Sequence, residues 1–117
     1  MIQNAQRVAL VLAISLTIVL LAASVVPSAG QVFSGKSHWF IHFISFAIFA
    51  FAWRYGLHRI STLVVALAVI AFGFIHEAIE MVGHTHNYEL GDAVIDSIGT
   101  ISGVLLATLA ARRLDPK

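Results

Sequence analysis

Residues 76–103 hold most of the side chains in this chain that could do chemistry. Six acidic residues occur in the sequence, and five of them fall in this window, together with three of the six histidines. They are Glu77, Glu80, Glu89, Asp92, Asp96, His76, His84 and His86. The flanking sequence is sparse in charge and strongly apolar. Because carboxylates are costly in an apolar environment, their concentration here predicts a functional site.

Carboxylates and imidazoles in such a window could transfer protons. In that chemistry one carboxylate, Glu77 or Asp96, acts as general base, and His42 is its proton partner. His42 is preferred over His38 because it lies one turn deeper in an apolar segment, whereas His38 is expected at the membrane interface. Glu77, Asp96 and His42 are therefore the candidate catalytic residues, and whether any bond is broken stays open.

A metal site is a second interpretation of the same window. His76 and Glu80 are four residues apart and share a helix face, as metal ligands on a helix do. The HEAIE run lacks the second histidine of the zinc hydrolase signature, so a structural His–Glu pair is favoured and no metal ligand or cofactor is assigned. A divalent cation held by mixed nitrogen and oxygen ligands is the alternative. Its ligands would be His42, Glu80, His86 and Asp96.

Composition limits the class of protein that can carry these residues. The chain has 117 residues, of which 59% are hydrophobic and 11% charged, and its mean hydropathy is +0.90. A soluble domain of this size could not cover so much apolar surface, so we expect one integral membrane domain over residues 1–117. A net charge of +1 without a basic stripe excludes nucleic-acid binding. The absence of cysteine excludes disulfides and thiolate chemistry.

The apolar runs predict four transmembrane helices, each long enough to cross a hydrocarbon layer of roughly 30 Å. Their expected ranges are 8–26, 38–55, 60–82 and 92–111. A cleavable signal peptide is the alternative for the first run, because small and helix-breaking residues follow it. However, the run is longer than a signal-peptide core of about 7–15 residues, so a retained helix is favoured.

The distribution of lysine and arginine predicts the orientation of this bundle. The two termini and the second loop lie on one side and hold six of these residues, whereas the first and third loops hold only Lys36. The six are Arg7, Arg54, Arg59, Arg112, Arg113 and Lys117. Because basic residues stay on the cytoplasmic side, the prediction is an all-α membrane protein, a bundle of four transmembrane helices with both termini cytoplasmic.

This topology would bring polar faces of three helices together at the outer side. Within each helix the polar residues recur at helical spacing, which places them on one face. The faces are His38 and His42; Gly73, Glu77, Glu80 and His84; and Asp92, Asp96, Gly99 and Gly103. Facing lipid would leave the carboxylates unpaired, so we expect them to turn inward. Gly99 and Gly103 form a small-residue face that allows close packing of the fourth helix.

Residues 36–103 resemble the VanZ-like family of small bacterial membrane proteins, named after a teicoplanin-resistance accessory protein. The family pattern has Lys and then His-Phe at the start of one helix and Glu-x-x-Gln at the end of the next. An Arg follows in the loop, and then Asp-x-x-x-Asn/Asp-x-x-Gly-x-x-x-Gly. The matching residues here are His42, Phe43, Glu77, Asp92, Asp96, Gly99 and Gly103.

Three positions depart from that pattern. Glu80 stands where the family has Gln, His86 or a neighbour replaces the loop Arg, and Lys36 lies three residues further from His42 than is usual. Losing the Arg removes a permanent cation that suits phosphate or carboxylate groups, and a histidine replaces it only in part. The resemblance adds a ligand-binding set to the candidate catalytic residues. It comprises Glu80, His86, Asp92 and Lys36.

The resemblance implies a multi-pass protein of the bacterial inner (cytoplasmic) membrane. Its outward-facing site would bind or process an amphiphilic envelope molecule, such as a lipid-linked glycan, a phospholipid headgroup or a glycopeptide, with a role in antibiotic tolerance. The expected partners are membrane lipids and that molecule. The alternative is a non-enzymatic accessory subunit of a larger membrane-protein complex, in which the polar faces only hold helices together.

Overall fold

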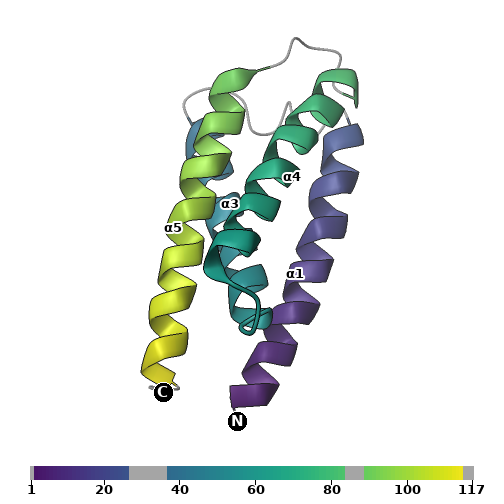
Figure 1. The fold of residues 1–117 in the computed structure, drawn as a ribbon. Helices are drawn as coiled ribbons and strands as arrows, with labels where there is room; N and C mark the ends of the chain where they lie inside the picture. Colours follow the sequence, from purple (N-terminus) through teal and green to yellow (C-terminus); the bar gives the residue numbers. More distant parts are fainter. Residues whose placement is uncertain (1, 27–36, 84–88, 115–117) are drawn as a thin grey trace.

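The computed structural model describes residues 2–26, 37–83 and 89–114, and these residues form four helices with no strand among them (Figure 1). The helices are α1 Ile2–Val25, α3 Ser37–Gly56, α4 Thr62–Gly83 and α5 Leu90–Leu114. They form an elongated bundle, and the N- and C-termini of the chain lie at the same end of that bundle (Figure 1). Consequently α3 and α5 run in one direction, and α1 and α4 in the other.

The helix boundaries differ from the expected ones where hydrogen bonds, rather than hydropathy, decide them. The first helix begins at Ile2 because the polar residues before the apolar run continue its hydrogen-bonded turns. The third expected helix begins at Thr62, since Ser61 caps it: its Oγ accepts the Val64 amide at 3.2 Å. The last helix begins at Leu90, where the Glu89 carbonyl accepts the first amides of the next turn.

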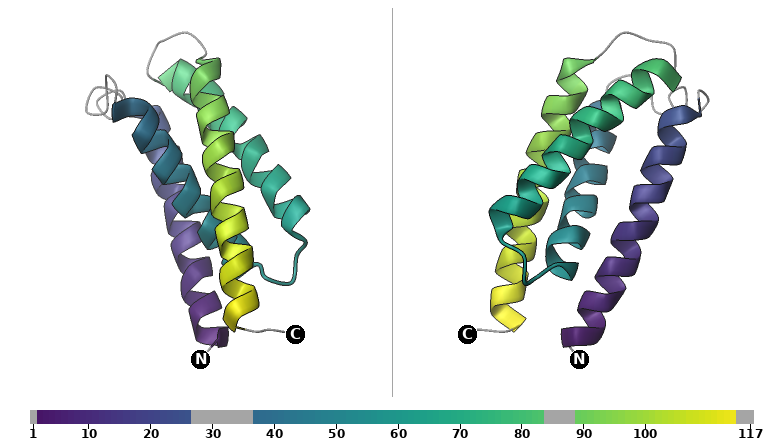
Figure 2. Two further views of the ribbon diagram at one scale, coloured as in Figure 1. Left: turned by 90° about the vertical axis from the view of Figure 1, so that its left-hand side faces the viewer. Right: turned by 45° about the vertical axis from the view of Figure 1, so that its right-hand side comes forward.

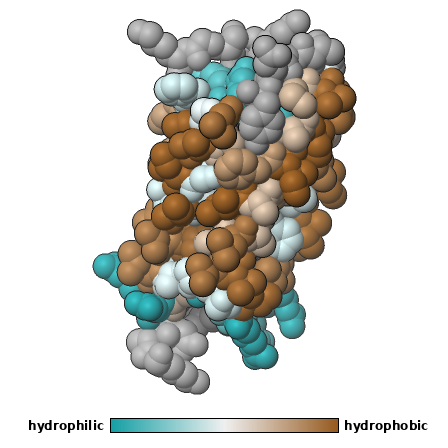
Figure 3. Space-filling view, turned by 45° about the horizontal axis from the view of Figure 1, so that its top comes forward, coloured by the Kyte–Doolittle hydropathy of each residue, from teal (hydrophilic) through white to brown (hydrophobic). Residues whose placement is uncertain are grey.

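Apolar side chains cover the sides of the bundle, and polar ones gather at its two ends (Figure 3). Three helices are long and apolar enough to cross a membrane. Their candidate spans are Gln3–Val25, Thr62–Gly83 and Leu90–Arg113. Helix α3 has 20 residues and is not among these candidate spans. The structure thus supports a helical membrane protein, with three candidate spans among the described residues.

The core lies in the middle of the bundle and is built on aromatic rings of α3. Phe46 and Phe49 are almost fully buried, and their ring centroids lie 5.7 Å apart in an edge-to-face arrangement. Phe72 of α4 packs on both rings. Helix α3 contacts each of the other three helices, so it is the centre of the bundle.

An apolar groove lies between α1, α3 and α4, toward the end that holds the chain termini. It has a volume of about 330 Å³, and its lining includes Thr17, Phe49, Trp53, Val64 and Phe72. Helix α4 is inclined to the other helices beside this groove (Figure 2). Because the lining is apolar apart from the Thr17 hydroxyl, the groove offers packing surface but no acid–base chemistry.

The most extensive packing in the bundle joins α3 to α5, and two glycines make it possible. A Cβ atom at Gly99 would lie 2.5 Å from the carbonyl oxygen of Phe43, and one at Gly103 would overlap the carbonyl oxygen of Ala47. Only hydrogen atoms at these two positions allow the backbones to approach so closely. The two parallel helices therefore touch along one seam, which continues into their first turns.

We predict that Gly103→Ala destabilises the bundle, because its methyl group must push α5 away from the Ala47 carbonyl. Overpacking of this kind costs about 1–3 kcal/mol, measured as a lower unfolding temperature in detergent by circular dichroism. Gly91→Ala is the matched control on the same helix, since a Cβ there would meet Trp39 at an ordinary 3.6 Å. Equal unfolding temperatures for the two variants would show that the seam is not tightly packed.

Candidate functional site

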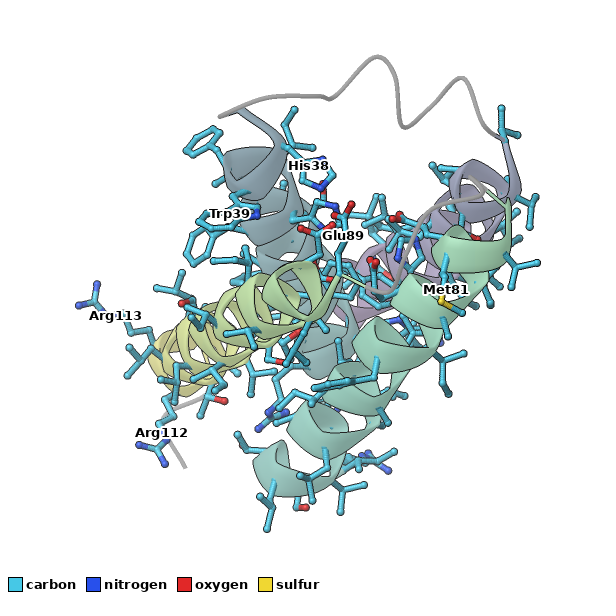
Figure 4. All side chains as sticks on the ribbon, turned by 90° about the horizontal axis from the view of Figure 1, so that it is seen from above. His38, Trp39, Met81, Glu89, Arg112 and Arg113 are labelled. Carbon is cyan, nitrogen blue, oxygen red and sulfur yellow. The ribbon has the colours of Figure 1, made fainter. Side chains whose placement is uncertain are left out.

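Six side chains from α3, α4 and the start of α5 meet at the end of the bundle opposite the chain termini (Figure 4). We call them the polar cluster; its members are His38, His42, Glu77, Glu89, Asp92 and Asp96. His38 and His42 precede the other four members by more than thirty residues in the sequence, so the fold brings the two sets together. Four of the six were predicted from the sequence as site residues.

Two histidines of α3 pair with two aspartates of α5 in one register. His38 Nε2 lies 2.8 Å from Asp92 Oδ2, and His42 Nδ1 lies 2.7 Å from Asp96 Oδ1. Both pairs join residues 54 positions apart, because parallel helices present every fourth residue to the same neighbour. The imidazole centroids are 4.4 Å apart. The cluster is therefore an extension of the glycine seam between α3 and α5.

Helix α4 contributes Glu77, which is fully buried. Its Oε1 accepts the backbone N–H of Glu89 at 3.0 Å, so this carboxylate ties the start of α5 to α4. Its Oε2 is also buried and has no hydrogen-bond partner within the described part of the chain. One turn earlier on α4, a Cβ at Gly73 would lie 3.4 Å from Asp96, so the glycine makes room for that side chain.

The cluster is most exposed at the end of the bundle and is buried toward the core. The side chain of Glu89 is 46% exposed, that of His38 is 23% exposed, and those of Asp92 and Asp96 are 2% and 1% exposed. His38 and Glu89 lie side by side where the three helices meet (Figure 4). A molecule at the membrane surface could therefore reach the outer members directly.

The carboxylates of the cluster are poorly balanced by positive charge. Among residues 2–26, 37–83 and 89–114, the ion pairs of Asp92 and Asp96 are made with the two cluster histidines alone. Arg112 and Arg113 extend from the opposite end of α5 (Figure 4). Because an unpaired buried carboxylate is costly, the fold holds these groups together against a free-energy penalty.

Glu80, predicted as a ligand-binding residue, contacts a histidine of its own helix. Its Oε1 lies 3.4 Å from Nδ1 of His76 on the same helix, and His76 Nε2 bonds the Leu20 carbonyl of α1 at 3.0 Å. This is the structural His–Glu pair favoured by the sequence, and it links α4 to α1.

The predicted cation set of His42, Glu80, His86 and Asp96 does not reappear in the structure as a group of converging ligand atoms. Neither Glu80 nor Asp96 belongs to the groups that converge within the described residues. His86 and Lys36, which were predicted to bind ligand, lie outside the residues that the structure describes.

Sequence reasoning left out two members of the cluster, His38 and Glu89. His38 was expected at the membrane interface, yet it is half-buried against Asp92. The signal was present in the spacing: His38 precedes His42 by four residues, as Asp92 precedes Asp96. Glu89 gave no periodic signal because it lies just before α5 begins.

The arrangement could serve as an acid–base unit. The Asp96 carboxylate accepts a hydrogen bond from His42 Nδ1, which fixes the ring and leaves Nε2 as the atom available to a ligand. Nε2 faces Asp92 Oδ2 at 3.7 Å, which is too long for a hydrogen bond. Asp96 therefore orients His42 through Oδ1. Glu77 Oε2 and Asp96 Oδ2 are buried carboxylate oxygens without a hydrogen-bond partner in the described part of the chain.

We predict a favourable coupling between His42 and Asp96. Unfolding of His42→Ala, Asp96→Ala and the double variant in detergent should give a coupling free energy of about 1.5–3 kcal/mol, as expected for a hydrogen bond to a charged group. The control cycle pairs His42→Ala with Ser97→Ala, because the Ser97 hydroxyl bonds its own helix at Ala93. Its coupling should stay within about 0.5 kcal/mol. Additive effects in both cycles would contradict the pairing.

Comparison of the chain with protein-family models, with curated proteins and with solved structures finds no match in any of the three.

Proposed function

We propose that this chain is a VanZ-like protein of the bacterial cytoplasmic membrane whose polar cluster binds the head of an amphiphilic envelope molecule. In this proposal all four helices cross the membrane, both termini are cytoplasmic, and the cluster faces the outside. The observation that carries the proposal is the cluster itself. Histidines and carboxylates from three helices converge at one end of an apolar bundle, and their exposure increases toward that end.

The distribution of charge supports this orientation. None of the described arginines belongs to the polar cluster. They lie near the chain termini and in or beside the turn after α3: Arg7, Arg54, Arg59, Arg112 and Arg113. Short basic segments stay on the cytoplasmic side of a membrane. If the end of the bundle that holds the arginines is cytoplasmic, the end that holds the polar cluster lies outside.

The length and the end residues of α3 support a fourth span. Its 20 residues are about as long as a hydrocarbon core of roughly 30 Å requires. Trp39 and Trp53 lie near its two ends, where interfacial aromatic residues are found. Its histidines turn inward and pair with aspartates, so they need not face lipid.

The chemistry of the cluster favours a hydroxyl- or amine-rich head group. Carboxylates and imidazoles accept hydrogen bonds from sugar hydroxyls and pair with ammonium groups. A bare phosphate would meet the carboxylates of Glu77, Glu89 and Asp92 and be repelled. Among the envelope molecules considered, a lipid-linked glycan or a glycopeptide therefore fits better than a phospholipid phosphate.

If the bound molecule is also chemically processed, the geometry gives Glu77, His42 and Asp96 different roles. Glu77 and Asp96 each have one buried carboxylate oxygen without a hydrogen-bond partner among the described residues. Glu77 is the preferred general base because the other oxygen of Asp96 holds His42. His42 would then exchange a proton with the ligand through Nε2, with Asp96 as the residue that orients it. Both versions, binding alone and binding with proton transfer, use the same cluster.

We predict that expression of this chain in a glycopeptide-sensitive bacterium raises glycopeptide tolerance or changes envelope lipid composition, and that Glu77→Gln and Asp96→Asn abolish the effect. Both variants keep side-chain size while removing the charge that organises the cluster. Ser97→Ala is the control, since the Ser97 hydroxyl bonds its own helix at Ala93. The proposal fails if both cluster variants, present in the membrane at wild-type levels, act like the wild type.

A further inference from the structure

We propose that the polar cluster binds one divalent first-row transition-metal ion through His38, His42 and Asp92, with Glu77 as a further carboxylate beside it. The inference concerns the same cluster as the proposed function but goes beyond it and does not depend on it. Ion binding can be measured on the purified chain without any envelope molecule. The ligand set also differs from the one considered from the sequence, because it contains His38 and excludes Glu80.

Three ligand atoms converge on one point. The Nε2 atoms of His38 and His42 lie 2.8 Å and 3.7 Å from the same oxygen, Oδ2 of Asp92. The ligand atoms of these residues all lie within 4.8 Å of one another. Metal bonds of about 2.0–2.2 Å to nitrogen and oxygen place neighbouring ligand atoms roughly 3.0–3.5 Å apart. The three side chains therefore need only small shifts to enclose an ion.

The second nitrogen of His42 is held as in many metal sites. Histidine ligands usually donate their other ring N–H to a carboxylate, which fixes the ring and increases its basicity. His42 Nδ1 makes this bond with Asp96 at 2.7 Å. When the ring is neutral with its proton on Nδ1, the lone pair on Nε2 faces an Asp92 oxygen across 3.7 Å, and two electron pairs oppose each other. A cation between these atoms turns the repulsion into two bonds.

Glu77 gives an independent reason to place a cation here. Its side chain is fully buried, and its Oε2 lacks a hydrogen-bond partner among the described residues. A carboxylate oxygen of Glu77 also lies within 4.8 Å of those of Glu89 and Asp92. A buried acceptor with no donor is costly, and a cation supplies what the protein does not.

The charge of the cluster leads to the same conclusion. Among the described residues, the carboxylates of the cluster outnumber the imidazoles that face them, four to two. The described arginines lie toward the other end of the bundle. A divalent ion balances this excess charge at the place where it occurs.

The donor atoms select the class of ion. Imidazole nitrogens suit Zn²⁺, Cu²⁺, Fe²⁺ and Ni²⁺, whereas Mg²⁺, Ca²⁺ and Mn²⁺ prefer oxygen ligands. His38 and His42 with one aspartate leave coordination positions open on such an ion. Because the side chain of His38 is 23% exposed, the ion can enter from the end of the bundle.

The test uses the full chain, purified in detergent through a tag without histidine and stripped with a chelator. Zn²⁺ is titrated by calorimetry, and Co²⁺ by its visible absorption. We expect one ion per chain, with at least tenfold weaker binding in His38→Gln and in His42→Ala. Asp96→Asn, which acts through His42, should weaken binding about 10–100-fold and retain one site. His38→Gln keeps the test valid if His42→Ala does not fold, because His38 lies at the partly exposed edge.

His76→Ala is the matched control. His76 is a buried histidine next to a carboxylate, but it lies outside the cluster, so the variant should bind Zn²⁺ like the wild type. The inference is overturned if the wild type shows no saturable binding, or if folded His38→Gln binds as tightly as the wild type. Zn²⁺ binding without any envelope effect would refute the proposed function alone. An envelope effect in a chain that binds no Zn²⁺ would refute the metal site alone.

Discussion

The close parallel packing of α3 against α5 is the constraint on which the polar cluster depends. Gly99 and Gly103 bring the backbone of α5 onto carbonyl oxygens of α3, and no side chain could be inserted without separating the helices. The same seam, continued toward the helix starts, holds two His–Asp pairs at one register. A shift of one helix by one residue would break both pairs together. Register, rather than any single hydrogen bond, is what assembles the site.

This seam explains how an apolar bundle can contain so many carboxylates. Asp92 lies in the first turn of α5, where free backbone N–H groups and the helix dipole stabilise a negative charge. Asp96 lies a turn deeper and depends on His42 instead. Glu77 is the contribution of α4 to the cluster, and its hydrogen bond from the Glu89 amide fixes the start of α5. The cluster thus combines structural roles with an excess of negative charge, and that excess is what a bound head group or cation would relieve.

Hydropathy alone predicts the helices, because length and apolar periodicity are local properties of the chain. It places the polar residues on the correct helix faces for the same reason. Hydropathy cannot predict which side chains contact each other, because those contacts depend on which helices are neighbours and on their register. The contact between Glu80 and His76 on the same helix is one such partner choice. His38, expected at the interface, contacts Asp92 because the α3–α5 register continues to the first turn. Helix ends also depend on capping by Ser61 and similar groups, which hydropathy does not measure.

The most direct test of the α3–α5 register is solid-state NMR on the chain in lipid bilayers, with ¹⁵N in histidine and ¹³C in aspartate. The register predicts a through-space correlation between Nδ1 of His42 and the carboxyl carbon of Asp96, with a ¹⁵N shift typical of a protonated ring nitrogen. The correlation should vanish in Asp96→Ala and persist in Asp115→Ala. A wild-type spectrum in which no histidine nitrogen correlates with any aspartate carboxyl carbon would contradict the register, and with it the assembly of the polar cluster.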